Sequence, residues 1–298
     1  GFAPYSICKK CGHKEICQNC SLYLTFHKIK NKAICHHCAF EKDIKNKCTL
    51  DKSCEFIMYG PGVEKIFDEL RIIFPEKNIK IFSSDFMSKK KEIDITIKKI
   101  EKNEINILIG TQLISKGFNF PNLNCIVVVD IDLSSHGHDL RVAEKNLQLY
   151  HQLSGRAGRT GQPSTVYFQT YNTNQKMISD ITNKNPDIFL DKEIIIRKQN
   201  NLPPFQRFIS LILIGENENR LEKEAIRLKL FVQNKINGKI LGPVSAPIFK
   251  INKKYRIRLL VRGPKTLKLQ NSLAKIITKF KFSSGIKLSV DVDPINFN

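Results

Sequence analysis

The sequence Gln152-Leu153-Ser154-Gly155-Arg156-Ala157-Gly158-Arg159 places two arginines three residues apart, among glycine spacers. Arginines at this spacing lie about one helical turn apart, so both guanidinium groups can face one ligand. An arginine placed in this way neutralises the charge that develops on a transferring phosphoryl group and accelerates the transfer roughly 10³–10⁵-fold. The alternative is an ordinary basic helix end, because arginine is common near helix C-termini. Agreement with the pattern Q-x-x-G-R-x-G-R over eight residues favours the phosphoryl interpretation.

This pattern resembles the last motif of the second motor lobe in superfamily-2 helicases. On that likeness, Arg156 and Arg159 act as finger and sensor toward a nucleoside triphosphate. Gln152 then couples the nucleotide state to the grip on DNA.

A second motif follows a predicted strand at residues 105–109 and runs from Gly110 to Pro121. It resembles the penultimate helicase motif, with threonine at the strand end, glycine six residues later and proline at its close. Hydroxyl, amide and backbone N–H groups in such a loop hold the phosphates of one DNA strand without reading its bases. The candidates for this contact are Thr111, Gln112, Ser115 and Lys116. The alternative is an ordinary crossover from a strand to a helix.

The nucleotide side of the same loop is predicted to include Gly117 and Asn119, together with Arg156 and Arg159. The motif usually has aspartate, facing the nucleotide sugar, where this chain has Asn119. Asparagine keeps an acceptor oxygen but loses the charge, so the contact with the sugar is weakened.

The segment around both motifs alternates short β-branched runs with longer helical periods. Strands are predicted at 56–59, 79–82, 105–109, 125–131 and 165–169, and apolar helical stripes at 63–73 and 140–150. Runs such as Ile126–Val129 have little polar alternation, which indicates strands that are buried on both faces. By the same reasoning Cys125 is predicted to be a core residue. Strand–helix repetition of this kind predicts an α/β fold with a parallel sheet and helices on both faces, as in a RecA-like motor lobe.

Nine cysteines are present, and eight of them fall within the first 54 residues. Three pairs are C-x-x-C knuckles, a spacing that lets two thiolates on one turn share a tetrahedral ion. A disulfide framework needs an oxidising compartment, for which the sequence gives no signal, and a redox C-x-x-C needs a strand–helix setting. The pattern therefore predicts two structural Zn²⁺ ions. The proposed ligands are Cys8, Cys11, Cys17, Cys20, Cys35, Cys38, Cys48 and Cys54.

The last pair is irregular, because five residues separate Cys48 from Cys54. Either a widened loop brings Cys54 to the metal, or Asp51 supplies an oxygen ligand. Sulfur suits a structural zinc site better, which favours Cys54. A segment of this size buries too little to fold without its metal, so zinc is expected to supply much of the folding energy.

Beyond Asn174 the pattern changes and predicts a small α+β domain of order β-α-β-β-α-β after a helix at 187–198. Basic residues gather around its predicted hairpin, together with Tyr255: Lys250, Lys253, Lys254, Arg256, Arg258 and Arg262. The hairpin is either a surface that binds the DNA backbone or stacks at a fork, or a strand edge that lysines protect from pairing.

The composition of the chain limits the kinds of partner and the location expected for it. The chain carries 49 basic and 28 acidic side chains for a net charge of +21, which favours polyanions such as DNA. The sequence has neither a membrane-length apolar run nor a secretory leader, so a cytoplasmic protein is expected. It also has no G-x-x-x-x-G-K-[ST] loop and no initiator methionine, which predicts that a first motor lobe lies upstream.

Taken together, these features resemble the PriA (primosomal protein N′) family of replication-restart DNA helicases. The likeness covers nearly the whole chain and includes the late signatures Leu202–Phe205, Leu241–Pro247 and Asp291–Pro294. It implies four regions: an edge of the lobe at 1–5, an inserted zinc segment at 6–55, the motor lobe at 56–185 and the C-terminal domain at 186–298. It also implies that the zinc ligands interleave, with Cys8, Cys11, Cys48 and Cys54 on one ion and Cys17, Cys20, Cys35 and Cys38 on the other.

The resemblance further implies an ATP- and Mg²⁺-dependent 3′→5′ DNA helicase that acts on stalled forks, D-loops and single strands. Implied partners are helicase-loading primosome proteins and single-strand-binding protein, in the bacterial cytoplasm at the nucleoid. The alternative function is a non-catalytic, zinc-containing scaffold that binds nucleic acid. For this chain alone no ATPase activity is expected, because half of the nucleotide site is missing.

Overall fold

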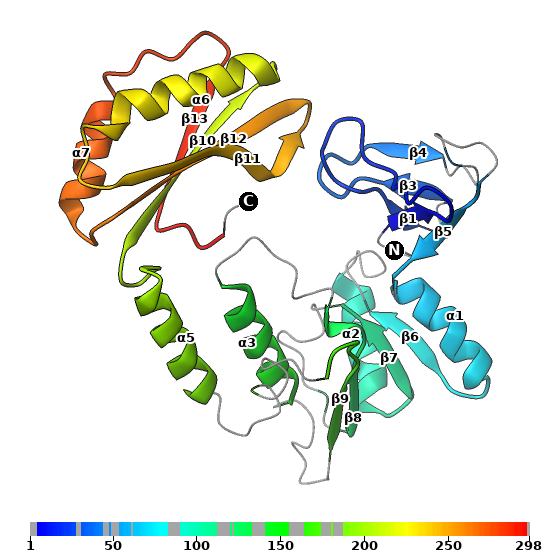
Figure 1. The fold of residues 1–298 in the computed structure, drawn as a ribbon. Coiled ribbons are helices and arrows are strands. Elements are labelled where there is room, and N and C mark those ends of the chain that lie inside the picture. The colour runs from blue at the N-terminus through cyan, green and yellow to red at the C-terminus, as the bar shows by residue number, and fades with distance from the viewer. Residues whose placement is uncertain are drawn as a thin grey trace. The chain divides into compact units, whose positions relative to one another are not determined.

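The computed structural model describes 5–27, 31–43, 48, 54–60, 62–82, 90–111, 120, 122–132, 141–154, 164–173, 180 and 187–296. The chain divides into two compact units. The first contains strands β1–β9 and helices α1–α3, and the second contains α5–α7 and strands β10–β13. Figure 1 shows these elements, most of them with their labels.

The cysteine-rich part of the first unit is built from short antiparallel strands. β1 (Tyr5–Cys8) pairs with β5 (Phe56–Tyr59), and β2 (Thr25–His27), β3 (Lys32–Ile34) and β4 (Glu41–Asp43) form a three-stranded sheet. The strand at 56–59 was predicted in the parallel sheet of the lobe. Its observed pairing with β1 is antiparallel, so that prediction was wrong among the described residues.

The α/β part of the first unit contains two parallel strand pairs, as the strand–helix alternation predicts. β6 (Ile79–Phe82) pairs with β7 (Ile107–Gly110), and β8 (Cys125–Val128) pairs with β9 (Thr165–Phe168). Helix α1 (Val63–Ile73) packs Ile66, Phe67 and Leu70 against a core with Ile79, Ile81 and Ile109. Helix α2 (Lys90–Glu101) was not predicted, because its charged sequence carries only a narrow apolar stripe.

Helix α3 (Val142–Ser154) contacts one side of the β8–β9 pair through Tyr150. Its Tyr150 is 1% exposed and meets Phe168 edge-on, with ring centroids 5.2 Å apart. The opposite side is open, since Val127 and its ladder partner Tyr167 are 59% and 57% exposed. Cys125 is also exposed. The predicted burial on both faces is therefore wrong for β8, because β-branched runs follow strand propensity as well as burial.

The second unit is a four-stranded antiparallel sheet in the order β11-β12-β10-β13. Its strands are β10 (Arg207–Gly215), β11 (Lys239–Ile251), β12 (Lys254–Gly263) and β13 (Lys287–Val292). Its helices are α5 (Asp187–Gln199), α6 (Glu218–Gln233) and α7 (Leu267–Ile277). This order confirms the predicted β-α-β-β-α-β pattern, and β11 begins earlier than expected.

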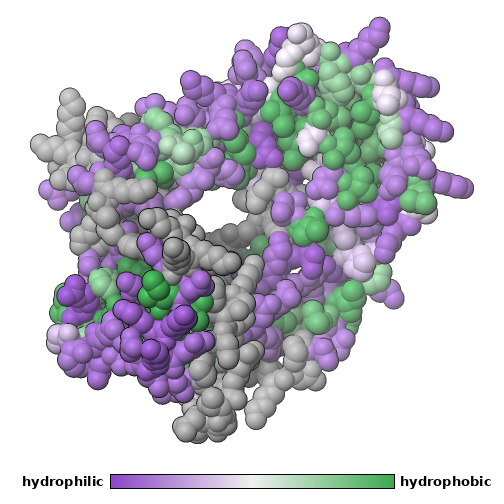
Figure 2. All heavy atoms as spheres, turned by 180° about the vertical axis from the view of Figure 1, so that it is seen from behind, coloured by the Kyte–Doolittle hydropathy of each residue, from purple (hydrophilic) through white to green (hydrophobic). Residues whose placement is uncertain are grey.

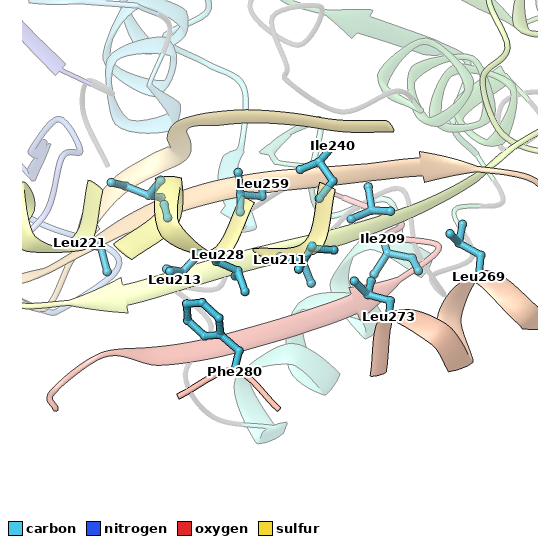
Figure 3. Close-up of a cluster of buried hydrophobic side chains, with 14 residues drawn as sticks. Ile209, Leu211, Leu213, Leu221, Leu228, Ile240, Leu259, Leu269, Leu273 and Phe280 are labelled. Atoms are coloured by element: carbon cyan, nitrogen blue, oxygen red, sulfur yellow. The ribbon is translucent and has the colours of Figure 1, made fainter. Parts of the chain in front are cut away.

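The core of the second unit lies between one sheet face and the helices α6 and α7. Alternate residues of β10, namely Ile209, Leu211 and Leu213, point toward Leu228 of α6 and Leu273 of α7 (Figure 3). The period of two along the strand and the period of 3.6 along the helix bring these side chains to one layer. Figure 2 shows apolar side chains gathered over this unit on the visible face, with hydrophilic side chains around them.

None of the helices among the described residues combines the length and the apolar character that crossing a bilayer requires.

Candidate metal centre and nucleic-acid interface

The sulfur atoms of Cys17, Cys20, Cys35 and Cys38 all lie within 4.8 Å of one another. The first three side chains are buried and the fourth is half-buried. The second knuckle is closed by two backbone bonds, from Cys35 N–H to the Phe40 carbonyl and from Ala39 N–H to the Cys35 carbonyl, both at 2.9 Å. This local geometry presents two thiols on one tight turn directly after β3.

A second group of sulfurs comes from Cys8, Cys11 and Cys48, which also lie within 4.8 Å of one another. The sulfurs of Cys11 and Cys48 are 3.6 Å apart. The sulfur of Cys54 lies 3.1 Å from that of Cys8, and both side chains are buried. The structure thus brings Cys54 to this group, while Asp51 lies outside the described residues.

Both groups fit a structural Zn²⁺ ion. Tetrahedral zinc with Zn–S bonds of about 2.3 Å sets its sulfurs about 3.8 Å apart, close to the observed spacing of Cys11 and Cys48. Backbone N–H groups of Cys11 and Lys10 point at the sulfurs of Cys8 and Cys54, over 3.5 and 3.2 Å. Such donors stabilise a thiolate, which is the form that binds metal. The Cys11 N–H is the largest cause that lowers the pKa of the Cys8 thiol, to about 6.

Histidines near the knuckles do not join either group. The Nε2 atoms of His27 and His36 lie 3.2 Å apart and face each other, and the ring of His13 lies 6.2 Å from that of Phe56. Among the described residues, the groups that could hold a metal are therefore the four sulfurs of Cys17, Cys20, Cys35 and Cys38 and the three of Cys8, Cys11 and Cys48, with the Cys54 sulfur beside that of Cys8.

Two candidate residues of the motor motifs are described. Gln152, the first residue of the arginine motif, is exposed on the last turn of α3. Thr111 is exposed at the carboxyl end of β7, where ligands of parallel α/β sheets bind. The remaining motor candidates lie outside the described residues: Gln112, Ser115, Lys116, Gly117, Asn119, Arg156 and Arg159.

Asp132, which was not singled out from the sequence, lies just beyond the carboxyl end of β8. Its carboxylate accepts bonds from the Thr170 hydroxyl at 3.0 Å and from the Tyr171 N–H at 2.8 Å. These bonds tie the segment after β8 to the segment after β9. Because the two segments are far apart in the sequence, no local pattern identifies this contact.

The basic hairpin of the second unit joins β11 and β12 through a turn with Asn252 and Lys253 at φ 49° and 66°. Two positive φ angles in succession are typical of a tight hairpin turn that matches strand twist. The Lys250 ammonium lies 5.1 Å from the Tyr255 ring centre. Arg256 and Arg258 are half-buried on β12, and burial lowers the pKa of each guanidinium. The predicted cluster is therefore divided between an exposed turn and a half-buried strand.

Comparison with known proteins gives three family matches. A profile described as the primosomal protein N C-terminal domain matches residues 198–295. One for the helicase conserved C-terminal domain matches residues 39–161. One for the PriA DNA helicase Cys-rich region domain matches residues 17–42.

Curated relatives match along essentially the full chain. The replication restart protein PriA of Rickettsia felis is 39% identical over 298 residues, covering 100% of this chain and 46% of that protein. Its counterpart from Haemophilus influenzae is 31% identical over 298 residues, covering 99% of this chain and 41% of that protein. The Bacillus subtilis protein is 28% identical over 300 residues, covering 99% and 37%. The chain thus spans less than half the length of these relatives.

Proposed function

Because the chain belongs to the PriA family of replication restart proteins, we propose that it forms the C-terminal part of an ATP-dependent 3′→5′ DNA helicase. The observation that carries this proposal is the match of the helicase C-terminal domain to residues 39–161. That range contains both the loop after β7 and the arginine motif after α3.

In the proposed mechanism this lobe and a first lobe would together hold ATP and Mg²⁺; ATP hydrolysis would supply the free energy, and Mg²⁺ would offset the charge of the phosphates. Arg156 and Arg159 stabilise the charge on the transferring phosphoryl group, and Gln152 transmits the nucleotide state to the DNA loop. Gly117 and Asn119 are proposed to contact the nucleotide.

The DNA loop holds one strand by its backbone. Thr111, Gln112, Ser115 and Lys116 offer hydroxyl, amide and ammonium groups, which suit phosphate oxygens and carry no base preference. Motion of the two lobes then advances the strand. The chain's charge of +21 favours this polyanionic substrate.

Zinc holds the cysteine-rich segment together. The sequence pattern, the two sulfur groups and the match to a PriA Cys-rich region all support zinc. We assign Cys8, Cys11, Cys48 and Cys54 to one ion and Cys17, Cys20, Cys35 and Cys38 to a second. The proposed domain organisation is a lobe edge at 1–5, the zinc segment at 6–55, the motor lobe at 56–185 and the C-terminal domain at 186–298.

The proposed substrates are stalled forks, D-loops and single strands, and the proposed partners are helicase-loading proteins and single-strand-binding protein. The proposed location is the bacterial nucleoid. These assignments rest on the family and on the basic charge, and each belongs to the whole protein.

The test replaces Arg156 or Arg159 by alanine in the complete protein. Hydrolysis of ATP is expected to fall roughly 10³–10⁵-fold if either arginine is the finger, with zinc content and forked-DNA binding retained. Arg220→Ala is the matched control, because Arg220 is exposed on α6. Undiminished hydrolysis in both arginine variants contradicts the finger assignment. Absence of hydrolysis in the unaltered complete protein favours the non-catalytic scaffold.

A further inference from the structure

Three tyrosines and a lysine form one cluster in the first unit, here called the tyrosine patch: Tyr5, Tyr23, Tyr59 and Lys14. The ring of Tyr5 stacks on that of Tyr59, with centroids 5.4 Å apart and planes 23° from parallel. It also lies 5.5 Å from the ring of Tyr23. The Lys14 ammonium lies 4.6 Å from the ring centre of Tyr5 and 5.0 Å from that of Tyr23.

The β1–β5 ribbon builds this patch. Tyr5 is the direct ladder partner of Tyr59, and Ile7 is the partner of Ile57 two residues along. Since side chains alternate along a strand, both tyrosines and both isoleucines of these two pairs lie on one face of the ribbon. An isolated bridge between Ile7 and Lys14 brings the lysine alongside. The opposite face of β1 carries Ser6 and Cys8, which are 9% and 2% exposed.

The patch face is open although its side chains are large and apolar. Tyr23 and Tyr59 are 47% and 45% exposed, and Ile57 is 37% exposed. The rings already stack on one another, so a flat ligand meets a preformed surface and little side-chain entropy is lost on binding. An open, ordered aromatic surface is typical of a binding site rather than of a core.

The charge at the patch is positive. Lys14 lies over the two rings, while its acidic neighbour Glu15 is buried and bonded to Lys42 at 2.6 Å. Lys9 and Lys10 are exposed beyond the end of β1 opposite Tyr5, next to the exposed Glu55. A cation beside open aromatic faces suits a ligand that combines flat π-systems with negative charge. Unpaired nucleotides have both properties, whereas an apolar protein surface offers no negative charge to the Lys14 ammonium.

We propose that the tyrosine patch binds single-stranded DNA by stacking its unpaired bases on Tyr23 and Tyr59, with Lys14 next to the phosphates. This inference rests on the proposed function, because it assumes that the chain handles DNA strands. The cysteine-rich segment would then bind the bases of a strand whose phosphates the motor lobe binds. Stacking on tyrosine tolerates every base, so the site is without sequence preference.

The direct test uses tyrosine fluorescence. The chain has seven tyrosines and no tryptophan, so its ultraviolet emission reports on tyrosines alone. The zinc-loaded 298-residue chain is titrated with a single strand of about ten thymidines, and with an abasic strand of the same length. The thymidine strand is expected to quench the emission and to bind more tightly. The abasic strand keeps the phosphates and is expected to leave the emission almost unchanged.

Substitutions locate the effect. Tyr23→Ala and Tyr59→Ala are each expected to weaken binding of the thymidine strand at least about fivefold, as the loss of one stacked base requires. Tyr59→Phe keeps the ring and is expected to bind as the unaltered chain does. Tyr59→Leu keeps the apolar character without the flat π-face and is expected to behave like alanine. Tyr171→Ala is the matched control, since Tyr171 is 88% exposed and lies after β9. Zinc content, measured for every variant, checks that the segment is folded.

Several results overturn the proposal. Base stacking at the patch is excluded if the chain binds thymidine and abasic strands with equal affinity. It is also excluded if Tyr59→Leu is folded and binds the thymidine strand with full affinity. Neither result contradicts the proposed phosphate contacts of the motor lobe. Patch variants that bind DNA normally in the complete protein but lose a partner protein identify a protein dock instead. Failure of the complete protein to bind any single strand contradicts the proposed function as well as this inference.

Discussion

Glu224 shows how one buried charge is held in the second unit. It is 4% exposed on α6, and its carboxylate accepts bonds from Arg227 at 2.6 and 3.0 Å and from the backbone N–H of Ser283 at 2.8 Å. Burial acts to raise the pKa of Glu224. The Arg227 and Ser283 bonds outweigh burial, and the net result lowers the pKa below its ordinary value of 4.5. The carboxylate therefore connects α6 to the segment before β13.

A pH dependence follows from this arrangement. A carboxyl group with a lower pKa in the folded than in the unfolded state stabilises the fold above pH 4.5, and that contribution is lost as pH falls through the folded pKa. Glu224→Gln is expected to cost about 1–3 kcal/mol in the unfolding free energy of the second unit at pH 7, because it removes the buried ionised acceptor of the bonds from Arg227 and Ser283. The cost is expected to shrink toward pH 3. Hydrogen exchange of α6 in the variant and the unaltered chain, at pH 7 and at pH 3, measures this loss of unfolding free energy.

Glu222→Gln is the control for this prediction, because Glu222 is exposed on the same helix. It is expected to leave exchange of α6 unchanged within about 0.5 kcal/mol. A Glu224→Gln variant with the same protection as the unaltered chain at pH 7 contradicts the role given to the carboxylate.

Some residues of the candidate sites were predictable and others were not. The eight cysteines follow from local spacing, and the structure brings their sulfurs into two groups, with Cys54 beside Cys8. The tyrosine patch was not predicted, because Tyr5, Tyr23 and Tyr59 are far apart in the sequence and meet only when β1 pairs with β5. Spacing motifs record local chemistry, whereas long-range pairing leaves no local pattern.

At the scale of elements, the zinc segment is expected to depend on metal for its folding. Its strands β1–β5 have three or four residues each, which is too short for independent stability. The buried cluster of Cys8, Cys48 and Cys54, with Phe56 packed on it, ties β1 to β5. Metal and sulfur therefore provide much of the cross-linking that a larger apolar core gives elsewhere.

Cys54→Ser is expected to remove a ligand from the first zinc site, so zinc content falls by about one ion per chain. Hydrogen exchange of β1 and β5 is expected to accelerate, while α6 in the second unit keeps its protection. Metal analysis together with exchange mass spectrometry measures both effects. Cys125→Ser is the control, because Cys125 is exposed on β8. If Asp51→Asn lowers the zinc content and Cys54→Ser does not, Asp51 is the ligand.

The elements themselves were predicted best where the pattern is regular. All three helices and all four strands of the second unit were expected from alternation and helical periods, with ends displaced by a few residues and an earlier start for β11. Helix α2 was missed because its apolar stripe is narrow. Strand β5 was assigned to the wrong sheet, because strand patterns predict exposure and not the identity of the neighbouring strand.

At the scale of the whole molecule, the chain carries one lobe of the proposed motor. Without a partner lobe to present the triphosphate, Arg156 and Arg159 have no reacting phosphoryl group to stabilise. The isolated chain is therefore expected to hydrolyse no ATP above background, even with saturating single-stranded DNA. A coupled-enzyme assay measures this, with the complete protein as the positive control. DNA-stimulated turnover by the isolated chain contradicts the prediction.

The open side of the β8–β9 pair affects how this chain behaves at high concentration. Val127 and Tyr167 form a strip of apolar side chains beside a parallel ladder, and Val129 extends it. Two copies that press such strips together remove them from water, so a concentrated preparation is expected to self-associate reversibly through this face. Storage at low protein concentration follows as the practical remedy, because self-association weakens on dilution.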